Sequence, residues 1–270
     1  MDSVKWTWKE YMLRNSFNYT ATYQYDSSFP WPYWTYEDLV SNWIGKKNFF
    51  ISPTKSFFHD KTKILLSMVS NCRPDLSNRY RMDILNQVKN IMGADFTFLG
   101  VCGTDSRVKD LNNDDIRAEY KFFIAFENTI CPNYITEKLL RPLTYNSVPI
   151  VAGLSREEYE KRLPGSAFIH IEDYPSIPEM IQDIMAISNN KERYDQFFDW
   201  RRDPGFARTE HVNRNAVFQN LLGVTMSREC SLVDWLTTDG NLEKEHHVDV
   251  IRDFSDPRPK FSKKYHQISF

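Results

Sequence analysis

The chain has 270 residues, enough for one large domain or two modest ones. It carries 34 basic and 36 acidic residues, and this balance excludes a dedicated nucleic-acid binder, because neutralising phosphates requires a basic face. Hydrophobic residues make up 41% of the chain, which is sufficient for a folded core, so the chain as a whole is not disordered.

Several common motifs are missing from the sequence. Neither the G-x-G-x-x-G fingerprint nor the P-loop motif occurs, so neither explains nucleotide binding. No apolar run of about 18 residues predicts a membrane span, and the charged, aromatic segment 1–10 does not resemble a signal peptide. The cysteines are too widely spaced for a zinc cluster, and they could be buried thiols or form up to two disulfides, with three full pairings open. They are Cys72, Cys102, Cys131 and Cys230.

Residues 1–60 are dense in aromatic side chains, and Pro30 and Pro32 interrupt regular structure there. We expect an irregular segment that forms part of a domain rather than a whole one. Asn18 begins an Asn-Tyr-Thr sequon, which is a glycosylation site if the protein is secretory.

From residue 63 onward, short apolar runs alternate with segments whose apolar residues recur every three or four positions. The runs predict buried strands and the periodic segments predict helices. Ser77 is the predicted N-cap of the first helix and Asn133 that of the second. The predicted strands are 64–69, 96–100, 122–126, 148–152 and 167–171, and the predicted helices are 80–91, 134–146, 156–163 and 177–188.

This alternation predicts an α/β fold with a parallel, doubly wound sheet. In such sheets ligands bind at the carboxyl ends of the strands, on the loops that lead into helices. The loop 127–134 is therefore the place to look for chemistry. Residues 192–209 are predicted to be helical, and the segment from about residue 239 is interpreted as a loose tail.

The loop combines groups that suit a nucleotide diphosphate. Glu127 and Asn128 follow the predicted strand, and the next helix begins with Tyr134 and carries Glu137 and Lys138 in its first turn. The free N–H groups and positive dipole end of a helix N-terminus suit a phosphate, and a lysine adds a full charge. The tyrosine could stack on a base, and the second glutamate could accept from ribose hydroxyls.

A second interpretation of the same residues requires no ligand. Glu137 and Lys138 could be an ordinary exposed start of a helix, and Asn128 could simply cap a turn. The spacing alone leaves both interpretations open.

Longer stretches of the chain resemble the α1,3-fucosyltransferase family. The stretches similar to the family signature are Lys121-Phe-Phe-Ile-Ala-Phe-Glu-Asn-Thr129, Asn133-Tyr-Ile-Thr-Glu-Lys138 and Asn146-Ser-Val-Pro-Ile-Val151. Further counterparts are Phe17–Ser27, Val69-Ser-Asn-Cys72 followed by Arg79 and Arg81, the stretch 159–174, and Trp200-Arg-Arg202. The resemblance runs from about Phe17 to Arg202.

The resemblance implies a GT-B-like α/β fold, with one complete Rossmann-like donor domain and a partial N-terminal acceptor domain. We expect residues 1–60 to be the remnant of the acceptor domain, 61–238 the GDP-fucose-binding domain and 239–270 a tail. The implied activity is the inverting transfer of L-fucose from GDP-fucose to N-acetylglucosamine units of glycans, in α1,3 linkage. The family's members are single-pass type II membrane proteins of the Golgi apparatus, and we expect their anchor and stem to be missing from this chain.

The resemblance also implies roles for individual residues. The diphosphate would contact Arg79 and Lys138, guanine and ribose would be held by Tyr134 and Glu137, and the fucose pocket would be lined by Asn128 and Glu127, the latter predicted as catalytic. Cations and a helix N-terminus can stabilise the charge on departing GDP without a metal. No Asp-x-Asp motif occurs, Asp114-Asp115 is interpreted as solvated, and neither a metal nor a cofactor is predicted.

Inversion needs a base on the opposite face of the sugar, to take the proton of the acceptor hydroxyl. In the family this carboxylate precedes the segment matched by Phe17, and Asp2 is the candidate by position. The positions of Gln24 and Ser28 usually carry charged residues, which puts acceptor binding in question. The alternative is a non-catalytic fucosyltransferase-like protein that binds a nucleotide sugar or a glycan, or pairs with a full-length relative.

Overall fold

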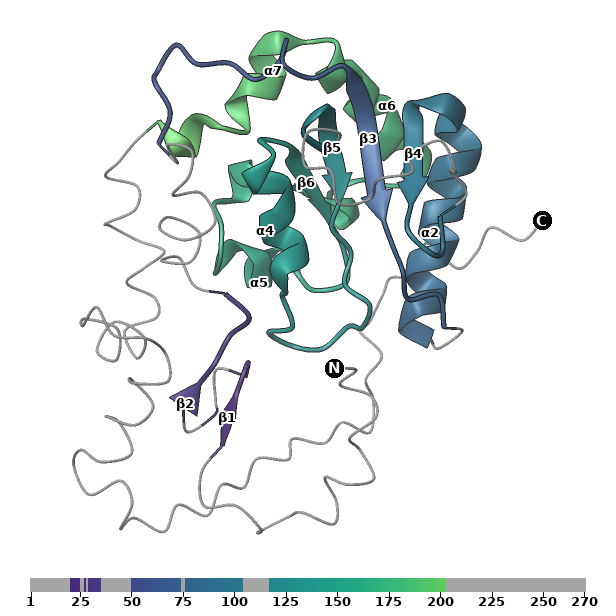
Figure 1. The fold of residues 1–270 in the computed structure, drawn as a ribbon, viewed down its shortest axis with the longest axis vertical. Helices are drawn as coiled ribbons and strands as arrows, with labels where there is room; N and C mark the ends of the chain where they lie inside the picture. The colour runs from purple at the N-terminus through teal and green to yellow at the C-terminus, as the bar shows by residue number, and fades with distance from the viewer. Residues whose placement is uncertain are drawn as a thin grey trace.

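A computed structural model describes residues 20–24, 27, 29–34, 50–73, 76–103 and 117–202. Its central feature is a five-stranded sheet in which every neighbouring pair is parallel (Figure 1). The strands are β3 (Lys63–Met68), β4 (Phe96–Leu99), β5 (Tyr120–Ile124), β6 (Val148–Val151) and β7 (Ile169–His170), in the spatial order β4-β3-β5-β6-β7.

Helices cover both faces of this sheet. One buried core joins α2 and α6 to the sheet, and a second core joins α4 and α5 to its opposite face (Figure 1). The helices are α2 (Leu76–Met92), α4 (Glu137–Thr144), α5 (Arg156–Glu160), α6 (Ile177–Ser188) and α7 (Lys191–Gln196). The predicted α/β fold with a parallel, doubly wound sheet is therefore confirmed, and none of the helices in the described ranges is long and apolar enough to cross a membrane.

The strand order identifies the point at which ligands bind in this class of fold. The chain runs from β3 outward to β4 and then returns past β3 to add β5 on the other side. The connections that leave β3 and β5 therefore diverge, which opens a crevice at the carboxyl ends of these two strands. Ser67 of β3 lies opposite Ile124 of β5 at this switch point.

The start of α4 differs from the prediction. The helix begins at Glu137, three residues later than expected, and its N-cap is Thr136, whose hydroxyl accepts from the Lys138 N–H. Asn133 has a φ of 62°, a left-handed conformation that cannot belong to the first turn of a helix. Asn133 is thus part of the preceding turn. Glu137 and Lys138 do occupy the first turn, as predicted.

Two further boundaries were placed wrongly. Helix α2 begins at Leu76, so Ser77 lies inside its first turn and is not the N-cap. Helix α5 ends at Glu160 rather than Leu163, because the residue before Pro164 is disfavoured in helical conformation. The helix over 177–188 has the predicted bounds, with Ser176 as a cap that accepts from the Glu179 N–H.

A disulfide between Cys72 and Cys102 joins the segments that follow β3 and β4. The same two segments approach closely at Gly100, whose φ is 94° and where a Cβ would lie 2.3 Å from the Val69 carbonyl oxygen. Only glycine fits this position. The loop that follows β3 is therefore held by a covalent bond and by close backbone packing, and one of the pairings that the sequence left open is identified.

The N-terminal segment contributes a two-stranded parallel sheet, β1 (Ala21–Thr22) with β2 (Phe29–Pro30). Trp34 follows it and is 2% exposed, packed into the core on the α4 side. Its indole N–H donates to the carbonyl of Thr136 at 3.1 Å, so this segment contacts the start of α4. Asp2, Asn18 and the predicted tail lie outside the described residues, and the partial acceptor domain stays a prediction.

Candidate functional site

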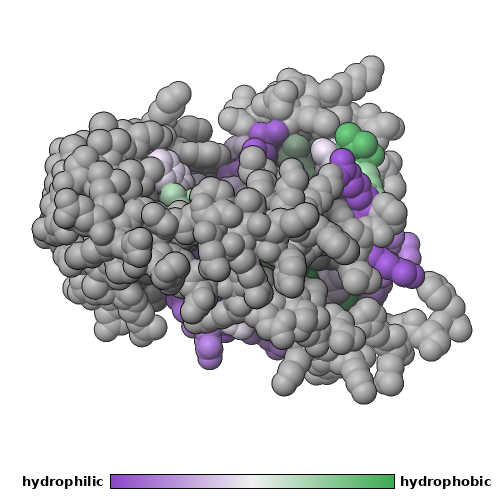
Figure 2. Space-filling model, turned by 90° about the horizontal axis from the view of Figure 1, so that it is seen from below, coloured by the Kyte–Doolittle hydropathy of each residue, from purple (hydrophilic) through white to green (hydrophobic). Residues whose placement is uncertain are grey.

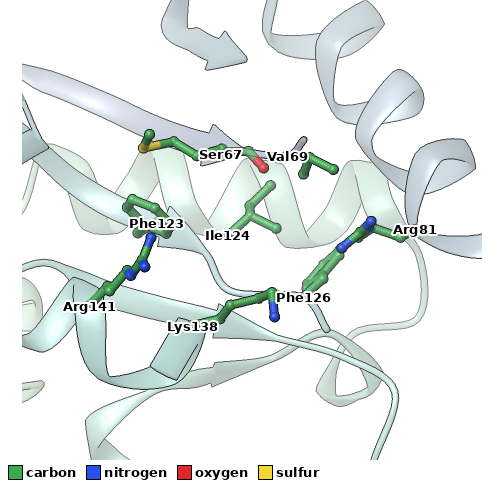
Figure 3. Close-up of a pocket in the computed structure, with 9 residues that line it drawn as sticks. Ser67, Val69, Arg81, Phe123, Ile124, Phe126, Lys138 and Arg141 are labelled. Atoms are coloured by element: carbon green, nitrogen blue, oxygen red, sulfur yellow. The ribbon is translucent and has the colours of Figure 1, made fainter. Parts of the chain in front are cut away.

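A small pocket lies at the switch point of the sheet (Figure 3). Its cavity volume of about 30 Å³ holds roughly two water-sized groups. It is lined by the ends of β3 and β5 and by side chains of α2 and α4, namely Ser67, Met68, Val69, Arg81, Phe123, Ile124, Phe126, Lys138 and Arg141. Its size suits the oxygens of an anionic group rather than a whole nucleotide.

Three cations line this pocket, and none of its lining residues in the described part of the chain is acidic. Arg81 comes from α2, whereas Lys138 and Arg141 lie three residues apart on α4. Arg81 and Lys138 point toward Phe126 from opposite sides (Figure 3). Positive charge on low-dielectric walls attracts an anion, so the composition of the pocket favours a phosphate.

Ser67 adds a polar group to the pocket. Its side chain is fully buried, and its hydroxyl has no hydrogen-bond partner among the residues that the structure describes. A buried hydroxyl left unpaired costs about 1–3 kcal/mol. In this cationic pocket the hydroxyl has hydrogen-bonding capacity left for an oxygen of a ligand.

The buried carboxylate of Glu127 organises the start of α4. One oxygen accepts from the backbone N–H of Thr136 at 2.7 Å and from its hydroxyl at 2.8 Å. The other accepts from the ammonium of Lys138 at 2.8 Å. The Thr136 hydroxyl also accepts from this ammonium at 3.0 Å. Loop and helix are thus joined by one compact polar network.

Burial dominates the electrostatics of Glu127. Removal from water raises the pKa of its carboxyl group, and the charge of Lys138 beside it opposes this rise without cancelling it. The carboxylate therefore depends on its lysine partner to stay ionised in this environment. The side chain of Lys138 is 30% exposed and so remains accessible to a ligand.

Tyr134 lies in a cluster of tyrosines. Its ring centroid is 5.3 Å from that of Tyr23 and 5.4 Å from that of Tyr33, both with edge-to-face geometry. Its hydroxyl donates to the side-chain oxygen of Asn128 at 3.2 Å, and burial raises its pKa. The ring is only 4% exposed, so stacking on a base would require its neighbours to move. Its guanine-binding role stays a prediction.

Gln24 forms a hydrogen bond with another uncharged side chain. The side chain of Asn133 donates to the Gln24 side-chain oxygen at 2.9 Å, and the Asn133 backbone N–H donates to Glu158 at 3.2 Å. A neutral amide pair therefore links the N-terminal segment to the loop before α4.

The structure brings together only some of the predicted residues. Glu127 and Lys138 form one network, and Asn128 contacts Tyr134 beside it. Glu137 is half-buried at the first position of α4, whereas Arg79 is exposed on α2 and does not line the pocket. The roles predicted for these residues stay predictions.

Three pocket residues were not predicted as ligands: Ser67, Arg81 and Arg141. A signal existed for Arg141, because it lies one helical turn after Lys138. None existed for Arg81, because residues two positions apart lie on different faces of a helix. Ser67 interrupts a strongly apolar strand at its carboxyl end, which is where this class of sheet binds ligands. Where described residues are visible in the space-filling view, hydrophilic groups predominate, and a small hydrophobic group lies at the upper right (Figure 2).

Comparison with known proteins places the chain in a family. Residues 58–251 match the family described as "Glycosyltransferase family 10 (fucosyltransferase) C-term". The chain is 32% identical over 194 residues to 4-galactosyl-N-acetylglucosaminide 3-alpha-L-fucosyltransferase 9 of Homo sapiens, covering 71% of this chain and 48% of that protein. It is 30% identical over 207 residues to glycoprotein 3-alpha-L-fucosyltransferase A of Drosophila melanogaster, covering 72% and 38%.

A crystal structure of an alpha1,3-fucosyltransferase with GDP-fucose is also similar, with a TM-score of 0.46 and 21% identity over 62% of this chain and 49% of that one. The matches in sequence show that the chain belongs to glycosyltransferase family 10, the fucosyltransferases. The resemblance seen in the sequence is confirmed. The chain spans about half the length of curated relatives that it matches, 48% of the human one.

Proposed function

We propose that this chain carries the donor-binding half of a GDP-fucose-dependent α1,3-fucosyltransferase. Its substrates would be GDP-fucose and a glycan that bears N-acetylglucosamine. The convergence of Arg81, Lys138 and Arg141 on one pocket at the switch point carries this proposal. Parallel α/β sheets bind nucleotides at this point, and the matched relatives are named for fucose transfer.

The chemistry of the reaction fits a cationic pocket. In an inverting transfer the acceptor oxygen forms a bond to the anomeric carbon of fucose while the bond from that carbon to the β-phosphate oxygen breaks. Negative charge then grows on departing GDP and positive charge grows on the sugar. Lys138, Arg141 and Arg81 would stabilise the phosphate, and each such contact contributes about 3 kcal/mol to transition-state stabilisation.

The remaining donor contacts follow from the placement of the predicted residues. Arg79, exposed on the same helix as Arg81, would meet the diphosphate from the solvent side. Glu137 would accept from ribose hydroxyls at the first position of α4. The edge of the Tyr134 ring would contact guanine. The tyrosine hydroxyl, which donates to Asn128, would orient that side chain toward the fucose.

The acceptor side of the reaction rests on the family resemblance. We propose Asp2 as the base that takes the proton of the acceptor hydroxyl, on the face of the sugar opposite GDP. The Gln24–Asn133 hydrogen bond supports a link between this N-terminal region and the donor loop.

The proposed location is the Golgi apparatus. The disulfide between Cys72 and Cys102 supports a compartment of the secretory pathway, because such bonds persist in oxidising environments. In that setting the Asn18 sequon would be available for glycosylation.

Binding and turnover measured on the full chain test this proposal. We expect GDP and GDP-fucose to bind in calorimetry, and transfer of fucose to an N-acetylglucosamine-containing oligosaccharide to be detected by mass spectrometry. An unrelated nucleotide sugar, UDP-galactose, serves as the control for the donor. Binding without transfer would favour the non-catalytic alternative, and absence of both would refute the assignment of the donor site.

A further inference from the structure

The carboxylate of Glu127 has little capacity left for a substrate. A carboxylate offers about four acceptor positions, and the N–H and hydroxyl of Thr136 and the ammonium of Lys138 already contact both of its oxygens. Its side chain is 5% exposed. A sugar hydroxyl would have to displace one of these charged or buried partners, so direct contact with fucose is disfavoured.

Lys138 is arranged in the complementary way. An ammonium has three N–H donors, and within the described part of the chain two of them are used, by the Glu127 carboxylate and the Thr136 hydroxyl. The third donor is left for a ligand, and the side chain lines the cationic pocket (Figure 3). Because a lysine side chain is long and flexible, two fixed partners reduce the entropy lost when it binds an anion.

We propose that Glu127 is a positioning residue, which holds the ammonium of Lys138 at the switch-point pocket and does not itself contact the sugar. Thr136 completes the device, since its hydroxyl donates to the carboxylate and accepts from the ammonium. This assignment replaces the predicted catalytic role of Glu127. It rests on the proposed function, in which the pocket takes the diphosphate of GDP-fucose.

The two roles give different binding patterns. A residue that contacts fucose affects the affinity for GDP-fucose but not for GDP, which lacks the sugar. A residue that positions Lys138 affects both ligands by the same factor, because both contain the diphosphate. Glu127→Gln preserves the shape of the side chain while it removes the charge and one acceptor of the ammonium. The matched control is Glu157→Gln, the same change at an exposed position of α5.

Calorimetry with GDP and with GDP-fucose separates these roles. We expect Glu127→Gln to raise both dissociation constants equally, by about tenfold, and Glu157→Gln to change neither. In a double-mutant cycle, Glu127→Gln should add little to the loss caused by Lys138→Met. A loss confined to GDP-fucose, no loss, or additive losses would overturn the positioning role.

Thr136→Val provides a second variant if Glu127→Gln does not fold. It removes the bridging hydroxyl and should weaken GDP and GDP-fucose equally, whereas unequal or absent effects contradict the proposal. Failure of the wild-type chain to bind GDP would overturn the proposed function, and this proposal with it. The wild-type result therefore decides the function of the site, and the variants decide the role of Glu127.

Discussion

Two buried or half-buried lysines near opposite ends of the sheet show how differently one residue type is used. Lys121, at the start of β5, donates to the carbonyl of Ser188 at 2.5 Å and lies 3.6 Å from the centroid of the Phe58 ring. Burial lowers its pKa. Lys138, beyond the carboxyl end of the same strand, is paired with the carboxylate of Glu127 and lines a cationic pocket.

The difference identifies what makes a lysine available for a ligand. Lys121 is surrounded by a carbonyl and aromatic rings, which satisfy its charge within the fold. Lys138 has an anionic partner that holds it in place and a solvent-accessible pocket that leaves one donor unused. Charge near a strand end is therefore informative only together with the partners that the tertiary structure gives it.

The largest expected effect tests this contrast directly. Lys138→Met should weaken GDP binding by about a hundredfold, because a charge-assisted contact to the diphosphate is lost. Lys121→Met, the same substitution at the other end of β5, should leave GDP affinity unchanged. Calorimetry on both variants measures the difference, and equal losses would contradict the assignment of the pocket.

The second effect concerns stability and pH. Lys138→Met leaves the buried Glu127 without its counter-charge and should destabilise the fold at pH 8 by about 2 kcal/mol. Burial raises the pKa of Glu127 in the folded protein. Stability therefore falls as the pH rises from the ordinary pKa of a glutamate through the pKa that Glu127 has in the folded protein. The penalty should therefore shrink as the pH falls, because protonation of the carboxyl group removes the unpaired charge.

Thermal unfolding across this pH range provides the measurement. The double variant Glu127→Gln, Lys138→Met is the control, because it has no carboxylate at this position and should show no additional pH dependence. A penalty for Lys138→Met that is constant with pH would show that the lysine does not act on Glu127.

A smaller effect sharpens the description of the pocket. Ser67→Ala removes a buried hydroxyl that lacks a partner among the described residues, so stability should be unchanged or higher by about 1 kcal/mol. GDP affinity should nevertheless fall about tenfold, because the hydroxyl would bond to a phosphate oxygen. Denaturant unfolding measures the change in stability, and calorimetry measures the change in GDP affinity. A loss of stability without a loss of affinity would make Ser67 a purely structural residue.

The smallest effect concerns Lys121 itself. Lys121→Met should remain within about 1 kcal/mol of wild-type stability at neutral pH, because loss of the bond to Ser188 offsets relief of the desolvation cost. Burial lowers the pKa of Lys121 in the folded protein. At high pH the lysine is neutral, so the wild type no longer carries the desolvation cost of a buried charge. The variant should thus become less stable relative to the wild type above about pH 10, as denaturant unfolding at two pH values would show.

The sequence predicted the elements of the sheet well because their signals are local. Apolar runs and helical periodicity placed all five strands and the helix over 177–188. The chemistry expected of the loop after β5 stays a prediction. The start of α4 was misplaced because its cap depends on Glu127, a residue nine positions earlier that contacts Thr136. Local propensity does not include such a contact.

The candidate site was predicted only in part. Residues of one continuous motif, Glu127 and Lys138, were identified together. Ser67 and Arg81 come from other elements and meet Lys138 only because β3 and β5 are neighbours in the sheet. Tyr134 was predicted as the first residue of the helix but lies before it. Its burial by Tyr23 and Tyr33 depends on a segment about 100 residues away.

The amino-acid sequence by itself determined the fold class and the family, because both depend on patterns along the chain: apolar periodicity and a continuous signature through Lys138. Which cations share a pocket, and which carboxylate is occupied by its neighbours, was decided only in three dimensions. Charge interactions act over a few ångströms of space and depend on burial, and neither quantity can be obtained from spacing along the sequence.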